Sequence, residues 1–278
     1  MEFKRLLLND TVFAAGTNDL NIPADHVKYL DIGLRGENCG STSSSVAVVG
    51  ALIDEIQLTL GGENICNIHY VDLLALNHIW EDIFPHYMTS GAADNANWSM
   101  DGVRLPLHVT KCGKGLSVRL TYAANALICD MILSLAYQYR ETPFASHFNY
   151  QYREALSTAA FQEINLDYAG AECIGILLFN TTIPICTIGA VVSDIDEVAI
   201  IVDDREIYRE NWHTMTRLHE NTDTTDDIAW GIHEDNYRWL DFQQEPLPSG
   251  KLRMLTNGTT TGHTIRIIPV YIQKNQAQ

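Results

Sequence analysis

Residues Ile53–Ile68 read I-D-E-I-Q-L-T-L-G-G-E-N-I-C-N-I, and residues Ile195–Glu210 read I-D-E-V-A-I-I-V-D-D-R-E-I-Y-R-E. The second stretch begins 142 residues after the first, about half the chain, and the two align without a gap. Identical residues in this alignment and its continuation are Ile53 and Ile195, Asp54 and Asp196, Glu55 and Glu197, Ile65 and Ile207, and Leu76 and Leu218. The chain therefore contains this unit twice.

Both copies have the alternating pattern of a half-buried strand followed by a tight turn. The apolar positions of period two are Ile56, Leu58 and Leu60 in the first copy and Val198, Ile200 and Val202 in the second. Gly61-Gly62 and Asp203-Asp204 then occupy the turn. A type I′ turn needs positive φ at both central residues, which glycine adopts freely and aspartate tolerates. Each copy therefore predicts a β-hairpin.

A helical pattern follows each predicted hairpin. Apolar residues recur at helical spacing, at Leu73, Leu76 and Trp80 in one copy and at Trp212, Met215 and Leu218 in the other. The repeated unit is thus strand, tight turn, strand and short helix. We interpret it as a duplicated domain.

Short strand patterns separated by turn residues fill both halves of the chain. Further strands are expected at Phe3–Leu8, His26–Arg35, Val46–Leu60, Leu105–Val109, Leu116–Tyr122, Leu127–Tyr139, Ile174–Leu178, Thr187–Val202, Lys251–Leu255 and His263–Ile272, and long loops at Phe84–Val103 and Asn221–Gly250. Pro269 marks an edge position or a bulge. Such a pattern predicts an all-β fold of two tandem eight-stranded jelly rolls, each with a short helix. Pro143 lies in the expected junction, which gives domains 1–142 and 143–278.

Composition excludes some partners. The chain of 278 residues carries a formal net charge of −17 and is 46% hydrophobic, which suits two domains with real cores. Direct nucleic-acid binding needs a basic stripe, and adsorption to anionic membrane needs basic residues, so both are disfavoured. The six cysteines form no C-x-x-C pair, and we expect them to be reduced, as in a protein made in a cytoplasm.

No catalytic, cofactor-binding or metal-binding residue is predicted. The sequence has no G-x-S-x-G motif and no H-x-H pair, and it lacks other metal-ligand spacing. His69 and His78 are interpreted as structural or surface groups. An acidic segment, interpreted as a solvated loop with calcium binding as the alternative, contains Asp223, Asp226, Asp227, Glu234 and Asp235. The loop tryptophans are interpreted as loop anchors, subunit contacts or sugar-stacking residues, and they are Trp98, Trp230 and Trp239.

Two tandem jelly rolls with matching strand–hairpin–helix units resemble the double jelly-roll major capsid proteins of tailless icosahedral viruses with an internal membrane, of the corticovirus and flavobacterial lipid-phage type. The resemblance rests on architecture and the repeated I-D-E hairpin, and it covers essentially the whole chain. It implies a non-enzymatic homotrimer whose six barrels form a pseudo-hexagonal tile. The implied partners are neighbouring trimers, minor capsid or vertex proteins and the viral membrane, without direct nucleic-acid contact. The implied location is the virion, after synthesis in the host cytoplasm.

A carbohydrate-binding or carbohydrate-cleaving double β-sandwich is the main alternative. It would need carboxylates and aromatic side chains converging in one cleft. The densest candidates in the sequence are Glu234, Asp235, Trp230 and Trp239. A metalloenzyme with two cupin-like domains is a third interpretation, which the missing H-x-H pair disfavours.

Overall fold

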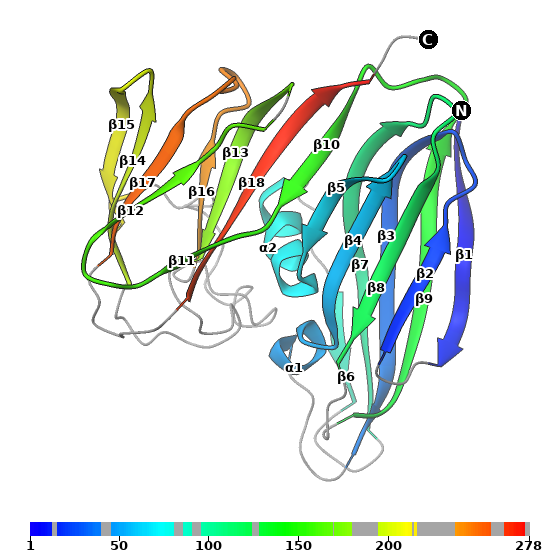
Figure 1. The fold of residues 1–278 in the computed structure, drawn as a ribbon. Helices are drawn as coiled ribbons and strands as arrows, with labels where there is room; N and C mark the ends of the chain where they lie inside the picture. The colour runs from blue at the N-terminus through cyan, green and yellow to red at the C-terminus, as the bar shows by residue number, and fades with distance from the viewer. Residues whose placement is uncertain are drawn as a thin grey trace. The chain divides into compact units, whose positions relative to one another are not determined.

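The computed structural model describes residues 1–12, 16–39, 46–80, 86–90, 96–123, 128–168, 170–179, 194–212, 214–215, 237–256 and 264–275. Among these residues the chain is built of β-strands and two short helices (Figure 1). Contacts divide it into a first unit, made of 1–149, 230–232 and 275–278, and a second unit, made of 150–229 and 233–274.

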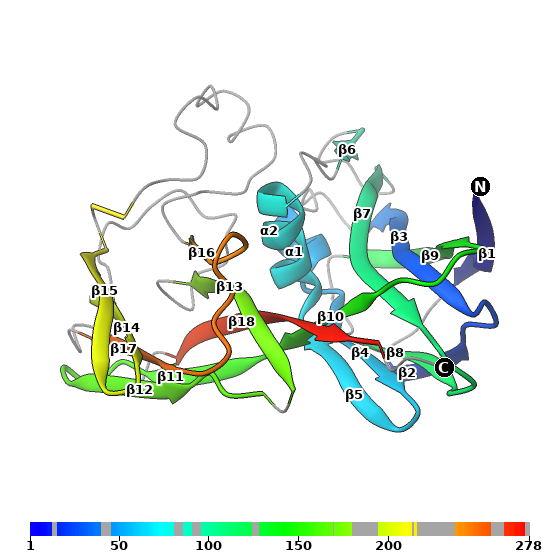
Figure 2. The same cartoon turned by 90° about the horizontal axis from the view of Figure 1, so that it is seen from above.

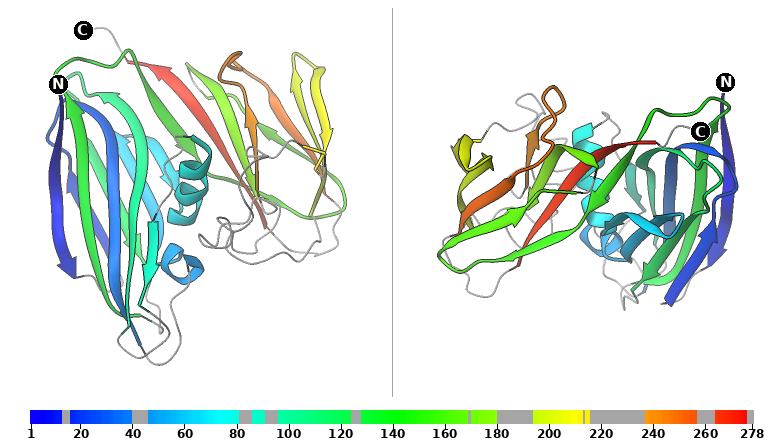
Figure 3. Two further views of the ribbon diagram at one scale, coloured as in Figure 1. Left: turned by 180° about the vertical axis from the view of Figure 1, so that it is seen from behind. Right: turned by 45° about the horizontal axis from the view of Figure 1, so that its top comes forward.

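The first unit contains two antiparallel sheets. One sheet has the order β1 (Glu2–Val12), β9 (Ile128–Arg140), β3 (His26–Asn38), β7 (Asn97–Thr110) and β6 (His86–Thr89). Its first four strands lie side by side in the rear view of Figure 3. The other sheet has the order β5 (Glu63–Ile68), β4 (Ile53–Leu60), β8 (Leu116–Tyr122) and β2 (Gly16–Asn21).

The second unit repeats this arrangement. One group contains β16 (Tyr237–Asp241), β13 (Ala171–Phe179) and β18 (Thr264–Lys274), with β11 (Arg153–Leu156) on the other side of β18. The other sheet contains β12 (Phe161–Asn165), β17 (Lys251–Thr256), β14 (Ile195–Val202) and β15 (Arg205–Asn211). The strand β10 (Ser146–Gln151) follows the junction between the two halves of the sequence.

Strand order identifies both units as jelly rolls. Leaving out β6 and β10, each unit has eight strands among the described residues. In both units strands one, eight, three and six form one sheet, and strands two, seven, four and five form the other. The predicted all-β fold of two eight-stranded jelly rolls is confirmed, with β6 as an added edge strand in the first.

The repeated hairpins are the strongest evidence for duplication. Both appear in Figure 2 as β4–β5 and β14–β15. Their turns have positive φ at all four central residues, Gly61, Gly62, Asp203 and Asp204. Bulges also repeat at the same offset. The pairing of β4 with β8 shifts between Ile53 and Glu55, and that of β14 with β17 shifts between Ile195 and Glu197. Because a bulge is a local device that bends a strand, its repetition shows that the two halves share backbone geometry as well as sequence.

Each jelly roll has its own apolar core. In β3 the residues Leu30, Ile32 and Leu34 are buried, while Asp31 is partly exposed and Arg35 is exposed, as the alternation predicted. The core of the second unit includes Ile176, Leu178, Val198, Ile200, Trp212, Leu252, Met254 and Ile267.

The helix α2 (Tyr70–Trp80) was predicted and lies against β4 and β7 (Figure 1). The backbone amide of His69, the residue before α2, donates to the carboxylate of Asp72 in the first turn at 3.0 Å, and this bond caps the start of the helix. The side chain of Asn77 accepts from the Arg104 amide of β7 at 2.6 Å and donates to the Arg104 carbonyl. The second predicted helix lies mostly outside the described residues.

Several sequence-based boundaries were wrong. The expected strand 46–60 begins at Ile53, and α1 (Val46–Gly50) precedes it, because a short apolar run does not distinguish strand from helix. The expected loop 84–103 contains β6 and the start of β7, and the expected loop 221–250 contains β16. Pro269 pairs with Ile176, next to a bulge between Cys173 and Gly175 of β13.

Candidate functional site

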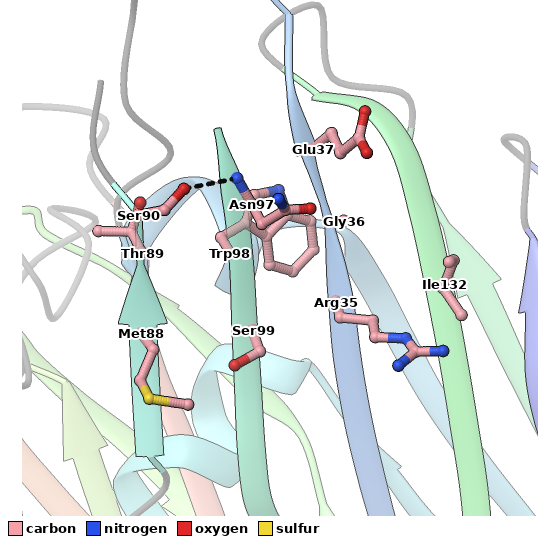
Figure 4. Close-up of a pocket in the computed structure, with 10 residues that line it drawn as sticks. All are labelled: Arg35, Gly36, Glu37, Met88, Thr89, Ser90, Asn97, Trp98, Ser99 and Ile132. Atoms are coloured by element: carbon pink, nitrogen blue, oxygen red, sulfur yellow. Dashed lines mark hydrogen bonds between the residues drawn. The ribbon is translucent and has the colours of Figure 1, made fainter. Parts of the chain in front are cut away.

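A hollow on the first unit lies on the face of the five-stranded sheet that carries the side chains of Arg35, Ser99, Met88 and Ile132 (Figure 4). Backbone pairing places these residues in one row across β9, β3, β7 and β6. Its volume is about 670 Å³. The remaining lining residues are Gly36, Glu37, Thr89, Ser90, Asn97 and Trp98.

The lining of this hollow is chemically mixed. It is lined by one acid, one base, hydroxyl and amide groups and the exposed thioether of Met88. The backbone amide of Asn97 donates to the Ser90 hydroxyl at 2.9 Å. No histidine or cysteine lines the hollow, and no group of three or more His, Cys, Asp or Glu positioned for a metal ion occurs among the described residues. These groups do not form the paired acid and base that hydrolysis of sugars or esters needs.

A polar network crosses the same sheet at Asp31. This carboxylate, 14% exposed, accepts from Lys4 and Arg104 at 2.8 Å and from Gln138 at 3.1 Å. Burial alone would raise the pKa of Asp31, but the hydrogen bonds from Lys4, Arg104 and Gln138 outweigh it, so its pKa lies below the ordinary value. The network joins β1, β3, β7 and β9, and its role is structural.

The second unit carries an ion-pair ladder on the face of the sheet β12-β17-β14-β15. Arg253 of β17 donates to Glu163 of β12 at 2.6 Å. Arg209 of β15 donates to Glu197 at 2.8 Å and to Glu206 at 2.5 Å. Because these pairs are largely exposed, each contributes little to stability. They give this face a regular pattern of opposite charges.

Two of the singled-out tryptophans are core residues, which corrects their interpretation as loop residues. Trp98 lies on β7 with 2% of its surface exposed, and Trp239 lies on β16 with 6% exposed. Trp239 is therefore removed from the set of candidate sugar-stacking residues. Trp230 and the acidic segment 223–235 lie outside the described residues. The ring of His69 bonds the Asp54 carbonyl beside the start of α2.

The expectation of six reduced cysteines was wrong for Cys39, which forms a disulfide. It directly follows β3, and the spacing of the cysteines in the sequence gives no signal of the bond. Cys66, Cys112 and Cys173 do not form disulfides. Burial raises the pKa of the Cys66 thiol well above its usual value and that of Cys173 to about 12, so both are inert, small apolar residues.

The two units share one strand order, and both halves carry the same hairpin and bulges. The chain has the double jelly-roll fold. Solved structures agree over the whole length. The STIV major capsid protein matches 99% of this chain and 97% of its own at a TM-score of 0.73 and 13% identity. The major capsid protein of bacteriophage PM2 matches 100% and 99%, with a TM-score of 0.61 and 12% identity. PBCV-1 VP54 matches 100% and 97%, with a TM-score of 0.62 and 11% identity.

By sequence, no family model and no curated protein matches the chain. The likeness therefore lies in the architecture. None of the helices among the described residues combines the length and the apolar character that a membrane crossing requires.

Proposed function

We propose that this protein is a viral major capsid protein, a structural, non-enzymatic subunit of an icosahedral shell. The observation that supports this most strongly is the tandem pair of jelly rolls, which aligns end to end with the STIV major capsid protein. We place the boundary between the jelly rolls in sequence at 142 and 143, between β9 and β10. The functional partner is first of all the chain itself.

The assembled unit that we propose is a homotrimer. Three copies of a chain with two similar barrels present six barrels, so a three-fold trimer has nearly six-fold edges. Such a tile can meet its neighbours in several nearly equivalent ways, which a closed shell requires. The regular charge ladder of the second unit and the hollow of the first are surfaces suited to repeated contact.

The position of the shell relative to a membrane belongs to the same proposal. The chain has a net charge of −17, which opposes direct contact with the nucleic acid of the genome. A lipid layer between shell and genome would remove the need for such contact. We propose that minor capsid or vertex proteins complete the shell, that the protein resides in the virion, and that it is synthesised in the host cytoplasm.

Electron microscopy of the purified protein tests the proposal. At increasing protein concentration we expect discrete three-fold particles with a hexagonal outline, followed by sheets or shells in which these particles pack side by side. The same preparation is applied to a glycan array. A strictly monomeric protein that binds glycans would refute the capsid function and favour the carbohydrate-binding alternative.

A further inference from the structure

A cluster of aromatic rings, in which Phe144 and Tyr29 are buried and His108 and Phe148 are half-buried, holds the segment 141–145, which connects β9 to β10. Phe144 at its centre is buried, and its ring stacks on that of His108 with centroids 4.9 Å apart and planes inclined by 3°. The centroid of the His108 ring also lies 5.0 Å from that of Phe148 and 5.9 Å from that of Tyr29. His108 is therefore packed on several sides by aromatic rings.

The backbone at His108 is built to direct this ring into the cluster. Pairing of β3 with β7 shifts between Val27 and Tyr29, so Leu107 and His108 together oppose the single residue Lys28. In this bulge His108 has a φ of 52°, which is uncommon for a residue other than glycine. A strained bulge persists only where the surroundings enforce it, and such sites are often functional.

Polar contacts fix the same segment. The amide of Phe144 donates to the Thr110 hydroxyl at 2.7 Å, and Asn275 donates to the Phe144 carbonyl at 2.8 Å. Arg140 donates to the carbonyls of Thr142 and Pro143 at 2.8 and 2.7 Å, and its guanidinium lies 3.6 Å from the Phe144 ring centre. The position of residues 141–145 thus depends on a single cluster of contacts around Phe144.

The environment of His108 favours its neutral ring. Its Nε2 atom is buried and finds no hydrogen-bond partner among the described residues, so a proton there would be a buried charged donor without an acceptor. Lys28 of β3 and Arg140 of β9 are positive neighbours, and Glu2 of β1, which accepts from Lys28 at 2.8 Å, is the negative one. Burial lowers the pKa of His108, and Lys28 and Arg140 lower it further against the weaker effect of Glu2.

A cation above a phenyl ring is normally attracted to it, which would favour a charged His108. Here the Phe144 ring already holds the Arg140 guanidinium, so a second cation on the ring would also face Arg140. A second histidine close to the segment also favours its neutral form. His147 of β10 shares a hydrogen bond of 2.8 Å with Asn275, and burial lowers its pKa as well.

We propose that the stack of His108 on Phe144 is an acid-sensitive latch: the neutral ring holds residues 141–145 on the first jelly roll, and protonation releases them. The sign follows from linkage. The His108 ring is protonated more readily in the released state than in the latched state. The neutral ring therefore stabilises the latched state fully at pH values above the ordinary pKa of histidine, and this stabilisation is lost as pH falls below it. With an ordinary pKa of 6.5, His108 alone favours release by at most about 30-fold at pH 5.0 relative to neutral pH.

Hydrogen exchange of the isolated full-length chain, followed by mass spectrometry at pH 7.5 and 5.0, tests the latch. After correction for intrinsic exchange rates, we expect protection of a peptide covering 141–149 to fall at pH 5.0, by at most about 30-fold from His108. A peptide from β14 serves as the internal control and keeps its protection. His108→Phe keeps an aromatic ring without a titrating group at this position and should make the pH response clearly shallower, leaving only the part that comes from His147. His69→Gln, a histidine beside α2, should leave it intact.

Wild-type protection that is equal at both pH values, or a His108→Phe response as steep as wild type, would overturn the proposal. If His108→Phe does not fold, His108→Asn replaces it, because asparagine tolerates positive φ and does not titrate. Its protection should be lower at pH 7.5 and should depend less on pH than that of wild type, and a wild-type slope would refute the latch. Any role of the latch in a capsid shell rests on the proposed function. The exchange experiment uses the unassembled chain, so the latch and the capsid function can be refuted independently.

Discussion

Replacing Gly175 by alanine tests how closely the second jelly roll is packed. Gly175 lies on β13 beside β16 and β18, and the indole of Trp239 covers it. A Cβ atom at this position would lie 2.0 Å from Cζ2 and 2.2 Å from Cη2 of that indole. Such distances cannot exist, so the ring or the strand must move.

The cost has two parts. Overpacking a core position costs about 1–3 kcal/mol. Exposing roughly 70 Å² of the displaced indole costs about 1.7 kcal/mol more at ~25 cal/mol per Å². We therefore expect Gly175→Ala to destabilise the second jelly roll by about 3–5 kcal/mol, which corresponds to a fall in Tm of roughly 6–20 °C.

Urea unfolding followed by tryptophan fluorescence and by circular dichroism measures this change. Gly33→Ala is the matched control, because Gly33 also lies within a strand, on β3, and its added Cβ would meet nothing closer than 3.5 Å. The control should stay within about 0.5 kcal/mol of wild type. A loss below about 1 kcal/mol in Gly175→Ala would show that Trp239 does not pack on this strand.

Three further changes have defined outcomes. Asp31→Asn should lower the free energy of unfolding at pH 7, measured by urea titration, by about 1–3 kcal/mol, because it removes a charged acceptor from three partners. Since folding lowers the pKa of Asp31, the difference from wild type should vanish as pH falls through that pKa, and a difference that persists in acid would contradict the network. Replacing Asp203-Asp204 by Asn-Gly, the preferred type I′ pair, should raise stability by about 0.5–1 kcal/mol in thermal unfolding, and a loss would exclude this turn type. Cys39→Ser should lower stability by about 2–4 kcal/mol under oxidising conditions and leave it unchanged against wild type in dithiothreitol, whereas an equal loss in both would argue against the disulfide.

Much of this fold was predictable because local rules and tertiary structure agree in it. The alternation in Ile53–Leu60 and the turn residues after it specify strand, turn and register within a few residues, and the second copy confirms the interpretation. Strand β3 was found for the same reason. Because the hairpin pattern occurs twice at the same spacing, it predicts the fold more strongly than either copy alone.

The missed strands are those with polar sequences. Strand β7 begins with Asn97, Ser99 and Asp101, which suggested a loop, although Trp98 and Met100 between them are buried. That alternation was a usable signal. The packing at His108 joins residues distant in sequence, and no cysteine spacing marks Cys39, so no local pattern predicted either feature.

The mass of the purified protein in solution, measured by light scattering coupled to size-exclusion chromatography, tests the central claim most directly. The account predicts a stable species of about 94 kDa, three times the 31.2 kDa chain, that persists on dilution. A species of 31.2 kDa at every concentration would contradict the proposal that this double jelly roll is a capsid subunit.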